Sequence, residues 1–365
     1  LSAEISEKVA KCVQEKTGLE RSSLMLTASH THSAPIVRSN LESMYDLPPE
    51  QWEKISQFNL MLEDKICQAI CDAVTNLKPA NVYRGCGSAD FAMNRREYTL
   101  DGIVIGNNPI GPVDHDVPVL KIEDESGTLI GVVFGYACHN TTLSGYEVNG
   151  DYAGFAQAYL EEEWPNVTAL YFIGCGADSN PYPRRSIELA KAHGRELSVA
   201  VEKVLTQPMK KVKGDIQASF KTIDLPLTEA PTKEQLETQK SDPYVYIQRR
   251  AKHLLAIWEK EGTLSNTYPY PVQTWTIGDD FNWIALAGEV VVDYSLLFKH
   301  LYGRENTWVT GYANDVFAYI PSLRVLREGG YEANESMIYY GIYGPWKPEI
   351  EKDIVDTVKS MIANH

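Results

Sequence analysis

Apolar residues recur along the chain with two different spacings, and each spacing predicts a different kind of element. Over residues 2–16 they recur every three or four positions, which predicts an amphipathic helix, and Gly18 marks its end. The same spacing predicts further helices over residues 51–74, 155–164, 186–205, 243–261 and 349–363. Short, almost continuously apolar runs predict buried strands over residues 23–29, 131–137, 167–173, 281–287 and 306–310.

Strands and helices alternate along much of this pattern. The alternation favours an α/β fold in which helices sandwich a mixed, mostly parallel central sheet. Farther along, residues 216–225 alternate between apolar and polar positions, and Gly278-Asp279-Asp280 between two apolar runs predicts a hairpin. No repeat, low-complexity tract or break in composition divides the sequence. We therefore expect residues 1–365 to form a single domain.

Composition and charge exclude several classes of protein. The 365 residues are 44% hydrophobic and 23% charged, which is typical of a globular protein, and the net charge is −15. An acidic chain is not expected to bind nucleic acid, and no apolar run approaches the length of about 20 residues that a membrane span needs. Six cysteines are too few for a disulfide scaffold, and Cys67 and Cys71 are interpreted as buried apolar side chains.

Polar residues follow the predicted strands at the point where each strand ends. In an open α/β sheet, ligands bind at the carboxyl ends of the strands. We therefore expect one site at this edge, formed by residues 30–32, 138–140, 174–181, 288–289 and 311–314.

Histidine and carboxylate residues at these strand ends indicate a metal site. His30 and His32 are two residues apart, so both imidazoles project to the same side of an extended segment. Two histidines on a solvated loop are the alternative. His139 and Glu289 at other strand ends favour the metal, because histidine plus carboxylate is a common ligand set for catalytic zinc.

Several motifs of the chain, taken in order, resemble those of the neutral/alkaline non-lysosomal ceramidase family. They are ASHTHSAP at 28–35, Asn94-Arg95, His139-Asn140-Thr141, GDYAG at 150–154, Gly288-Glu289, GYAN at 311–314, Tyr319 and Gly330-Tyr331-Glu332. The resemblance implies a zinc amidase that cleaves the amide bond of N-acylsphingosine. It implies four residues at the metal: His30, His139, Glu289 and Tyr319. It also implies three further residues of the active site: His32, Arg95 and Tyr331.

The chain also departs from the family pattern. The family's Gly-Asp-Val-Ser-Pro-Asn segment is here Gly176-Ala-Asp-Ser-Asn-Pro181, and a gapless overlay puts Ser179 on the functional serine. The competing chemistry is acyl transfer to Ser179 with His32 as base, although Ser179 lacks a G-x-S-x-G elbow. We expect a short homologue without the family's C-terminal immunoglobulin-like domain. We also expect the natural N-terminus to lie upstream of Leu1, so the sequence predicts no compartment.

The resulting prediction is zinc-dependent hydrolysis of a linear amide in a small-molecule or lipid N-acyl substrate, by water that the metal activates. One alternative is a metal-dependent hydrolase of a smaller N-acyl amine or amino sugar, with a polar pocket formed by Arg38, Arg95 and Arg184. The other is a homologue that binds without turnover. Asn140 or Asp151 is expected to orient a ligand histidine, although Asp151 is equally well explained as a helix N-cap. No oligomeric state is predicted.

Overall fold

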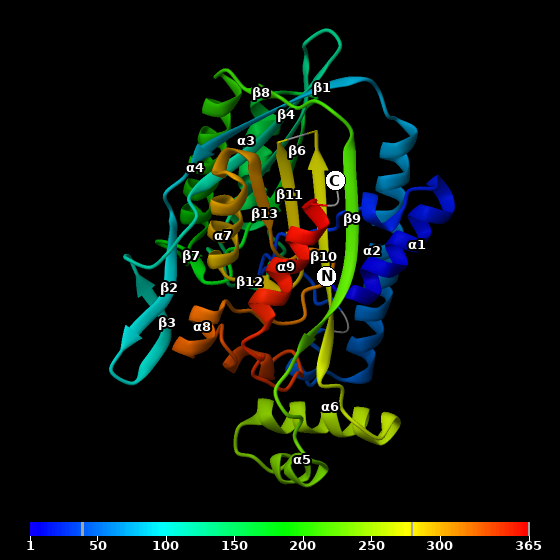
Figure 1. Ribbon diagram of the computed structural model, residues 1–365, viewed down its shortest axis with the longest axis vertical. Helices are drawn as coiled ribbons and strands as arrows, with labels where there is room; N and C mark the ends of the chain where they lie inside the picture. The colour runs from blue at the N-terminus through cyan, green and yellow to red at the C-terminus, as the bar shows by residue number, and fades with distance from the viewer. Residues whose placement is uncertain (38–39, 279, 364–365) are drawn as a thin grey trace.

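The computed structural model of the protein describes residues 1–37, 40–278 and 280–363. Its two larger sheets lie face to face, with helices on both outer sides (Figure 1). The first sheet has the order β6 (Thr168–Ile173), β5 (Leu129–Tyr136), β4 (Asp116–Asp124), β1 (Ala80–Ser88), β8 (Lys210–Lys211). The second has the order β13 (Thr307–Thr310), β11 (Phe281–Leu286), β10 (Thr267–Ile277), β9 (Ile216–Pro226).

Two smaller sheets flank these layers. One pairs β12 (Glu289–Val290) with β14 (Tyr319–Ile320), and the other has the order β3 (Gly102–Asn108), β2 (Ala92–Thr99), β7 (Ser179–Pro181). The helices are α1 (Ala3–Thr17), α2 (Pro49–Thr75), α3 (Asp151–Glu163), α4 (Ile187–Leu205), α5 (Lys233–Gln239), α6 (Val245–Glu261), α7 (Val292–Tyr302), α8 (Leu323–Glu328) and α9 (Ile350–Ala363). Within the described ranges, none of these helices has the length and apolarity needed to cross a membrane.

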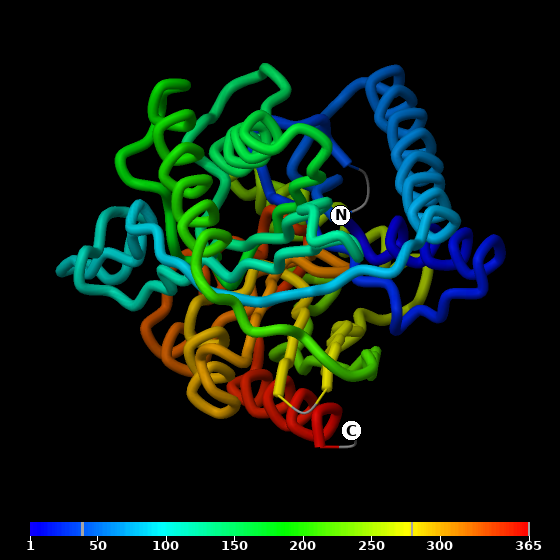
Figure 2. The backbone as a smooth tube through the Cα atoms, turned by 90° about the horizontal axis from the view of Figure 1, so that it is seen from above, coloured from blue at the N-terminus to red at the C-terminus, as the bar shows by residue number. Residues whose placement is uncertain are grey.

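The layers follow from the two faces of each strand. In β11, the Trp283 side chain faces the first sheet and packs on Phe172 of β6 and on Trp308 of the neighbouring strand β13. The next side chain, Ile284, faces the opposite way and packs in the core with α7 and α9. Successive side chains of a strand point to opposite faces, so one strand contributes to two cores. The first sheet does the same, because Phe134 joins the core under α3 and α4. Figure 2 shows α3 and α4 on one side of the sheets and α7 and α9 on the other.

The predicted α/β class with mixed sheets is confirmed, but "mostly parallel" and a single central sheet are wrong. In the two large sheets only β5–β6 and β11–β13 are parallel among the described pairs, and the other pairs are antiparallel. Short connections such as the hairpin between β10 and β11 explain this, since parallel neighbours need a long crossover. The predicted hairpin is therefore present, although Asp279 of its turn lies outside the described residues.

Two further expectations differ from the structure. Residues 23–29 form no strand: Thr27 makes an isolated bridge to Ala313, and residues 21–23 are a short 3₁₀ helix. Cys67 is buried as expected, but it is bonded to Cys12, so a disulfide joins α2 to α1. No C-x-x-C spacing marks this pair, because its cysteines are 55 residues apart. Elsewhere the predicted helices match the observed bounds to within a few residues, apart from 155–164, whose helix starts at Asp151.

Candidate functional site

The parallel strand pairs described in the two large sheets, β5–β6 and β11–β13, end close together beside the predicted site. His139 follows β5, and Glu289 lies just after β11. Gly174, directly after β6, bridges to Thr310 at the end of β13, which brings the ends of the two large sheets together. The predicted location of the site at carboxyl strand ends therefore matches the arrangement of these side chains.

The segment that carries His30 lies beside the end of β13. The backbone N–H of Ala28 donates to the carbonyl of Tyr312 over 3.3 Å, and Asn140 Nδ2 donates to the carbonyl of Ser29 over 2.5 Å. His30 itself has φ = 59°, a left-handed conformation that is uncommon for a residue with a side chain. The Asn140 side chain thus holds the backbone next to His30, and among the described residues it makes no hydrogen bond to a histidine ring.

Three imidazoles and one carboxylate come together at this point. Glu289 Oε2 lies 3.1 Å from His139 Nε2 and 3.3 Å from His30 Nε2. His32 Nε2 lies 3.2 Å from His30 Nε2. One ring nitrogen from each of the three histidines lies within 4.8 Å of the other two. The structure therefore brings together four residues that the sequence placed at one site, although they lie up to 259 positions apart in the chain.

Hydrogen bonds and charge set the protonation of these groups. His139 Nδ1 lies 2.8 Å from the carbonyl of Gly176, so this nitrogen carries the proton and Nε2 presents a lone pair to the site. Burial, followed by repulsion from Arg95, lowers the pKa of His139 to about 4. Burial alone would raise the pKa of Glu289, but His30 and His139 hold it well below its usual range. Neutral imidazoles with an ionised carboxylate are the forms that bind a metal.

Among the described residues, three tyrosines contact Glu289 or His139, and a fourth packs on one of these three. Tyr319 Oη lies 3.4 Å from His139 Nε2, and the Tyr331 ring packs edge-on against Tyr319 with 5.3 Å between centroids. Sequence reasoning singled out these two but missed the contacts of Tyr312 and Tyr340. Tyr312 Oη lies 3.4 Å from Glu289 Oε2, and Tyr340 donates to Oε1 of the same carboxylate. Tyr312 stands inside the GYAN motif, whereas no motif marked Tyr340.

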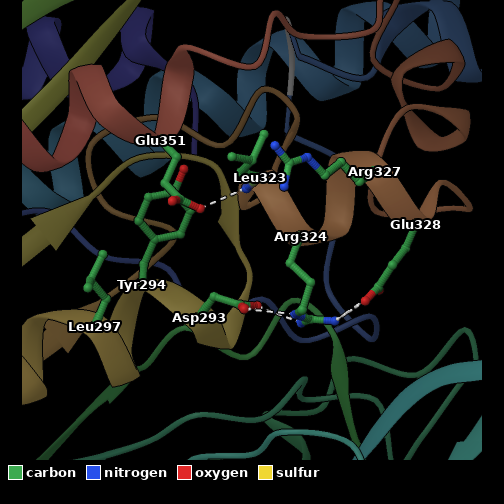
Figure 3. Close-up of a pocket in the computed structure, with 8 residues that line it drawn as sticks. All are labelled: Asp293, Tyr294, Leu297, Leu323, Arg324, Arg327, Glu328 and Glu351. Carbon is green, nitrogen blue, oxygen red and sulfur yellow. Dashed lines mark hydrogen bonds and ion pairs between the residues drawn. The ribbon is translucent and has the colours of Figure 1, made fainter.

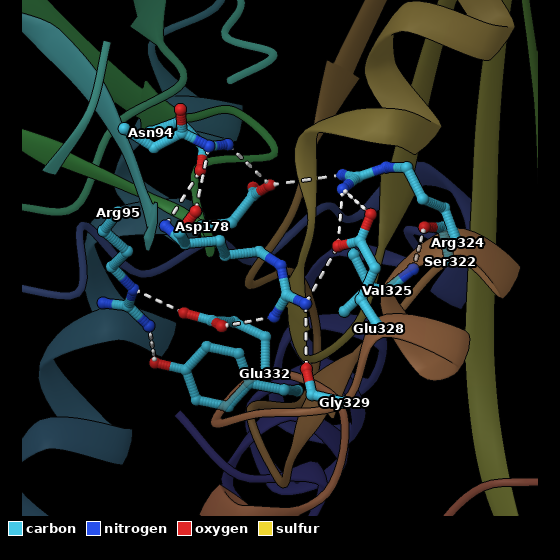
Figure 4. Close-up of polar contacts among 12 residues, drawn as sticks. Asn94, Arg95, Asp178, Ser322, Arg324, Val325, Glu328, Gly329 and Glu332 are labelled. Atoms are coloured by element: carbon cyan, nitrogen blue, oxygen red, sulfur yellow. Dashed lines mark hydrogen bonds and ion pairs between the residues drawn. The ribbon is translucent and has the colours of Figure 1, made fainter. Parts of the chain in front are cut away.

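Arg95 connects this site to a buried chain of ion pairs (Figure 4). Its Nη2 donates to Tyr319 Oη over 2.9 Å, and its Nε donates to Glu332 Oε1 over 2.7 Å. The other oxygen of Glu332 accepts from Arg96 over 2.7 Å, so one buried carboxylate serves two buried guanidinium groups. The cluster of His30, His32, His139 and Glu289 is called the metal-competent cluster below. The ion pairs with Glu332 fix the position of Arg95 beside it.

The chain of ion pairs continues to the surface. Arg96 also contacts Glu328, which pairs with Arg324, and Arg324 donates to Asp293 over 2.6 Å. Figure 3 shows this outer end, where Arg324, Asp293 and Glu328 line a pocket of about 460 Å³. Asp178 lies 4.0 Å from Arg324, and burial raises its pKa to about 7.

Ser179 is placed differently from the other predicted residues. Its side chain is fully buried and its Oγ has no hydrogen-bond partner. Among the hydrogen bonds of the described residues, none joins it to His32. Its backbone carbonyl accepts from the N–H of His139 over 3.0 Å. A Ser179–His32 nucleophile pair is thus absent from this part of the structure, and Ser179 supports His139 through the backbone.

The remaining candidates contribute less. Arg38 lies outside the described residues. Arg184 is half-buried, and its pKa is lowered by burial and by Arg185 and Arg95. Asp151 begins α3 rather than capping it, and its carboxylate accepts from the N–H of Leu143 over 2.8 Å, so it orders the loop after His139. Its other carboxylate oxygen accepts from the N–H of Tyr152 in the first turn of α3 over 2.7 Å, which satisfies a helix N–H as a cap would, and among the described residues Asp151 makes no hydrogen bond to a histidine side chain.

Gly176 allows the strand ends to approach, and an alanine there is expected to damage the site. A Cβ at Gly176 would lie 2.5 Å from Cys138 N and 2.7 Å from the Ala137 carbonyl carbon, both backbone atoms. We expect Gly176→Ala to cost about 1–3 kcal/mol in the free energy of unfolding, measured in urea. Gly154→Ala is the control, because nothing lies within 4 Å of its Cβ and a helical glycine gains about 0.5–1 kcal/mol as alanine. Equal stability of the two variants would contradict this explanation.

Known proteins resemble this chain in sequence and in fold. Residues 1–181 match the family model for neutral/alkaline non-lysosomal ceramidase, N-terminal. Neutral ceramidase B of Dictyostelium discoideum is 29% identical over 153 residues, which are 39% of this chain and 20% of that protein. Neutral ceramidase of Pseudomonas aeruginosa is 23% identical over 226 residues, which are 56% of this chain and 32% of that protein.

The fold extends the similarity over almost the whole chain. A crystal structure of neutral ceramidase from Pseudomonas aeruginosa superposes with a TM-score of 0.70 at 17% identity, covering 99% of this chain and 64% of that one. A ceramidase complexed with C2 gives a TM-score of 0.68 at 16% identity, covering 97% of this chain and 64% of that one. The sequence alignments cover about a third or less of the length of these curated relatives, and the superpositions cover 64% of each solved chain. Through the match of residues 1–181, the chain belongs to the neutral/alkaline non-lysosomal ceramidase family.

Proposed function

We propose that this chain is a zinc-dependent amidohydrolase that cleaves a linear N-acyl amide, as a single catalytic domain. The observation that carries the proposal is the convergence of His30, His139 and Glu289 within 3.3 Å contacts. Membership of a ceramidase family supports hydrolase chemistry, and the names of the relatives support N-acyl substrates. The oriented Nε2 of His139 and the ionised Glu289 fit zinc, which favours nitrogen and carboxylate ligands.

His30, His139 and Glu289 would hold the metal, with Tyr319 beside His139. Zinc bound there would polarise the amide carbonyl and make an adjacent water molecule more acidic. His32 is the base in this proposal. Burial and then repulsion by His30 and His139 lower its pKa to about 3, so the imidazole is neutral but only weakly basic, and it could accept a proton at Nε2 only from a water molecule that zinc has made more acidic. The protonated imidazole would then return the proton to the leaving amine nitrogen.

Arg95 and two tyrosines provide donors for the developing negative charge. Because Arg95 donates to Tyr319 Oη, the tyrosine's own hydrogen is available for a substrate oxygen. Arg95 stays charged, since Tyr319 and Glu332 outweigh burial and raise its pKa. Tyr331 stands next to Tyr319 and faces a cavity, which suits contact with the substrate. Losing one such donor typically costs about 10²–10³ in rate.

Removing the metal tests this function directly. We expect a chelator to abolish amide hydrolysis. Adding zinc should restore the activity and adding magnesium should not, because imidazole ligands disfavour magnesium. The metal content of each protein sample is measured, and the same sample is assayed for turnover of an N-acylsphingosine, an N-acyl ethanolamine and an N-acyl amino sugar. Undiminished turnover by the metal-free, folded chain would rule the proposal out. Stoichiometric zinc without turnover of any amide would favour the homologue that binds only.

A further inference from the structure

Another cavity is lined by Tyr331. It has a volume of about 450 Å³ and lies between α6 and residues 331–344. Its lining includes Tyr244, Arg250, Tyr331 and Tyr339. Tyr331 packs on Tyr339 with 6.2 Å between ring centroids and on Tyr319 with 5.3 Å. Tyr331, which lines the cavity, is thus separated from His139 of the cluster by the single side chain of Tyr319.

Arg250 distinguishes this cavity. The Arg250 side chain is half-buried, and its Nε is buried without a hydrogen-bond partner among the described residues. The buried arginines of the protein are arranged differently, since Arg95 and Arg96 each contact a carboxylate at 2.7 Å. A buried guanidinium nitrogen without a hydrogen-bond partner is unfavourable, and the half-buried side chain of Arg250 leaves the group within reach of a ligand in the cavity. A ligand anion in the cavity would supply the missing partner.

The tyrosines add donors to the same wall. Tyr244 Oη and Tyr339 Oη lie 3.0 Å apart, and only one of these hydroxyls donates to the other. The second hydroxyl hydrogen is therefore free to donate to a ligand oxygen. A guanidinium with phenol donors and aromatic walls is suited to an oxyanion on an organic molecule.

We propose that this cavity binds an acidic group, a carboxylate or a phosphate, carried by the substrate whose amide lies at the metal-competent cluster. The substrate class would then be N-acyl amino acids or N-acyl aminoalkyl phosphates. The inference rests on the proposed function, because it assigns the amide to that site. It also predicts a length requirement, since the acidic group has to extend past Tyr331 to reach Arg250.

Replacing Glu335 is expected to raise the affinity of the cavity for an anion, whereas replacing Arg250 is expected to lower it. Glu335 also lines the cavity, and its side chain is exposed. Its carboxylate repels a ligand anion, so Glu335→Gln is expected to improve binding of the acid severalfold. Arg250→Met is expected to weaken it. Lys252→Met is the matched control, because Lys252 is an exposed residue of the same helix and its loss removes the same charge.

The experiment compares matched substrates on the full chain. N-dodecanoyl ω-amino acids of increasing spacer length are paired with the N-dodecanoyl amino alcohols of equal length and with their phosphate esters. At the best spacer we expect the acid to exceed the alcohol in kcat/KM, and Arg250→Met to lower this ratio by about ten- to a hundredfold, mainly through KM. Lys252→Met should leave the ratio unchanged. Preference for carboxylate or for phosphate identifies the source of the anion.

A binding measurement separates this inference from the proposed function. In ketone analogues a CH₂ replaces the amide NH, so nothing can be hydrolysed, and calorimetry gives Kd for acid and alcohol. Tighter binding of the acid that Arg250→Met abolishes and Lys252→Met does not supports the cavity, even if no amide is ever cleaved. Equal binding of acid and alcohol at every spacer, or equal effects of the two variants, would overturn the inference while leaving hydrolysis of neutral amides intact.

Discussion

Replacing Glu289 with alanine is expected to remove bound zinc and amide hydrolysis together. Glu289 contacts both His30 and His139, and it is the one carboxylate of the described residues in this cluster. Loss of a group that only supports a ligand costs about 10–100-fold in metal affinity, so loss of a proposed ligand should cost more. Zinc per chain after dialysis and turnover of an N-acyl substrate are the two measurements.

Two variants control this experiment. Glu289→Gln keeps the volume of the side chain but not its charge, so zinc should still be weakened while packing is kept. Ser179→Ala should leave zinc in place, because the Ser179 hydroxyl makes no hydrogen bond among the described residues and its carbonyl remains to hold His139. A Glu289→Ala protein that keeps its metal and full turnover would end the ligand assignment. Loss of all activity without loss of zinc in Ser179→Ala would favour acyl transfer to Ser179.

Replacing Glu332 with alanine is expected to give the largest loss of stability. The side chain is 1% exposed and accepts from both Arg95 and Arg96 at 2.7 Å. Without it, two buried guanidinium groups lose their main carboxylate partner. Breaking a buried ion pair from one side typically costs about 3–5 kcal/mol. Urea unfolding of the wild type and the variant gives the free energy of unfolding directly.

The matched control is Glu328→Ala in the same network. Glu328 is more exposed, at 18% of its side chain, and Arg96 keeps Glu332 as a partner when it is removed. We expect Glu328→Ala to cost clearly less than Glu332→Ala. If both variants lose less than about 1 kcal/mol, the chain of ion pairs does not stabilise the fold and Arg95 must be positioned by other contacts.

The sequence predicted the centre of the site better than its surroundings. His139 and Glu289 directly follow apolar runs, and strand ends are placed by the sheet, so their convergence could be inferred before any coordinates. Tyr340 follows no strand and belongs to no recurring pattern. Its contact with Glu289 depends on how residues 331–344 fold over the site, which only tertiary packing decides.

The errors in the predicted fold have similar physical causes. An apolar run shows that a strand is buried, but not whether its neighbour is parallel, so the balance of strand directions was wrong. Residues 23–29 have the composition of a strand, yet apart from one bridge to Ala313 they make no ladder. The Cys12–Cys67 bond was missed because pairing depends on how α1 packs against α2.

The two sides of the proposed metal site come from different layers of the fold. His139 follows β5 of the first sheet, and Glu289 stands in the short strand β12, three residues after the end of β11 of the second sheet. An ion bound by both residues would link the two sheets, which pack on each other where Phe172 contacts Trp283. Ligand saturation at 1,000 times Kd adds about 4 kcal/mol to stability. The melting temperature would therefore rise with the fraction of chains that hold the ion. Replacing Phe172 or Trp283 with a smaller side chain would weaken the affinity for the ion, although neither residue is a proposed ligand.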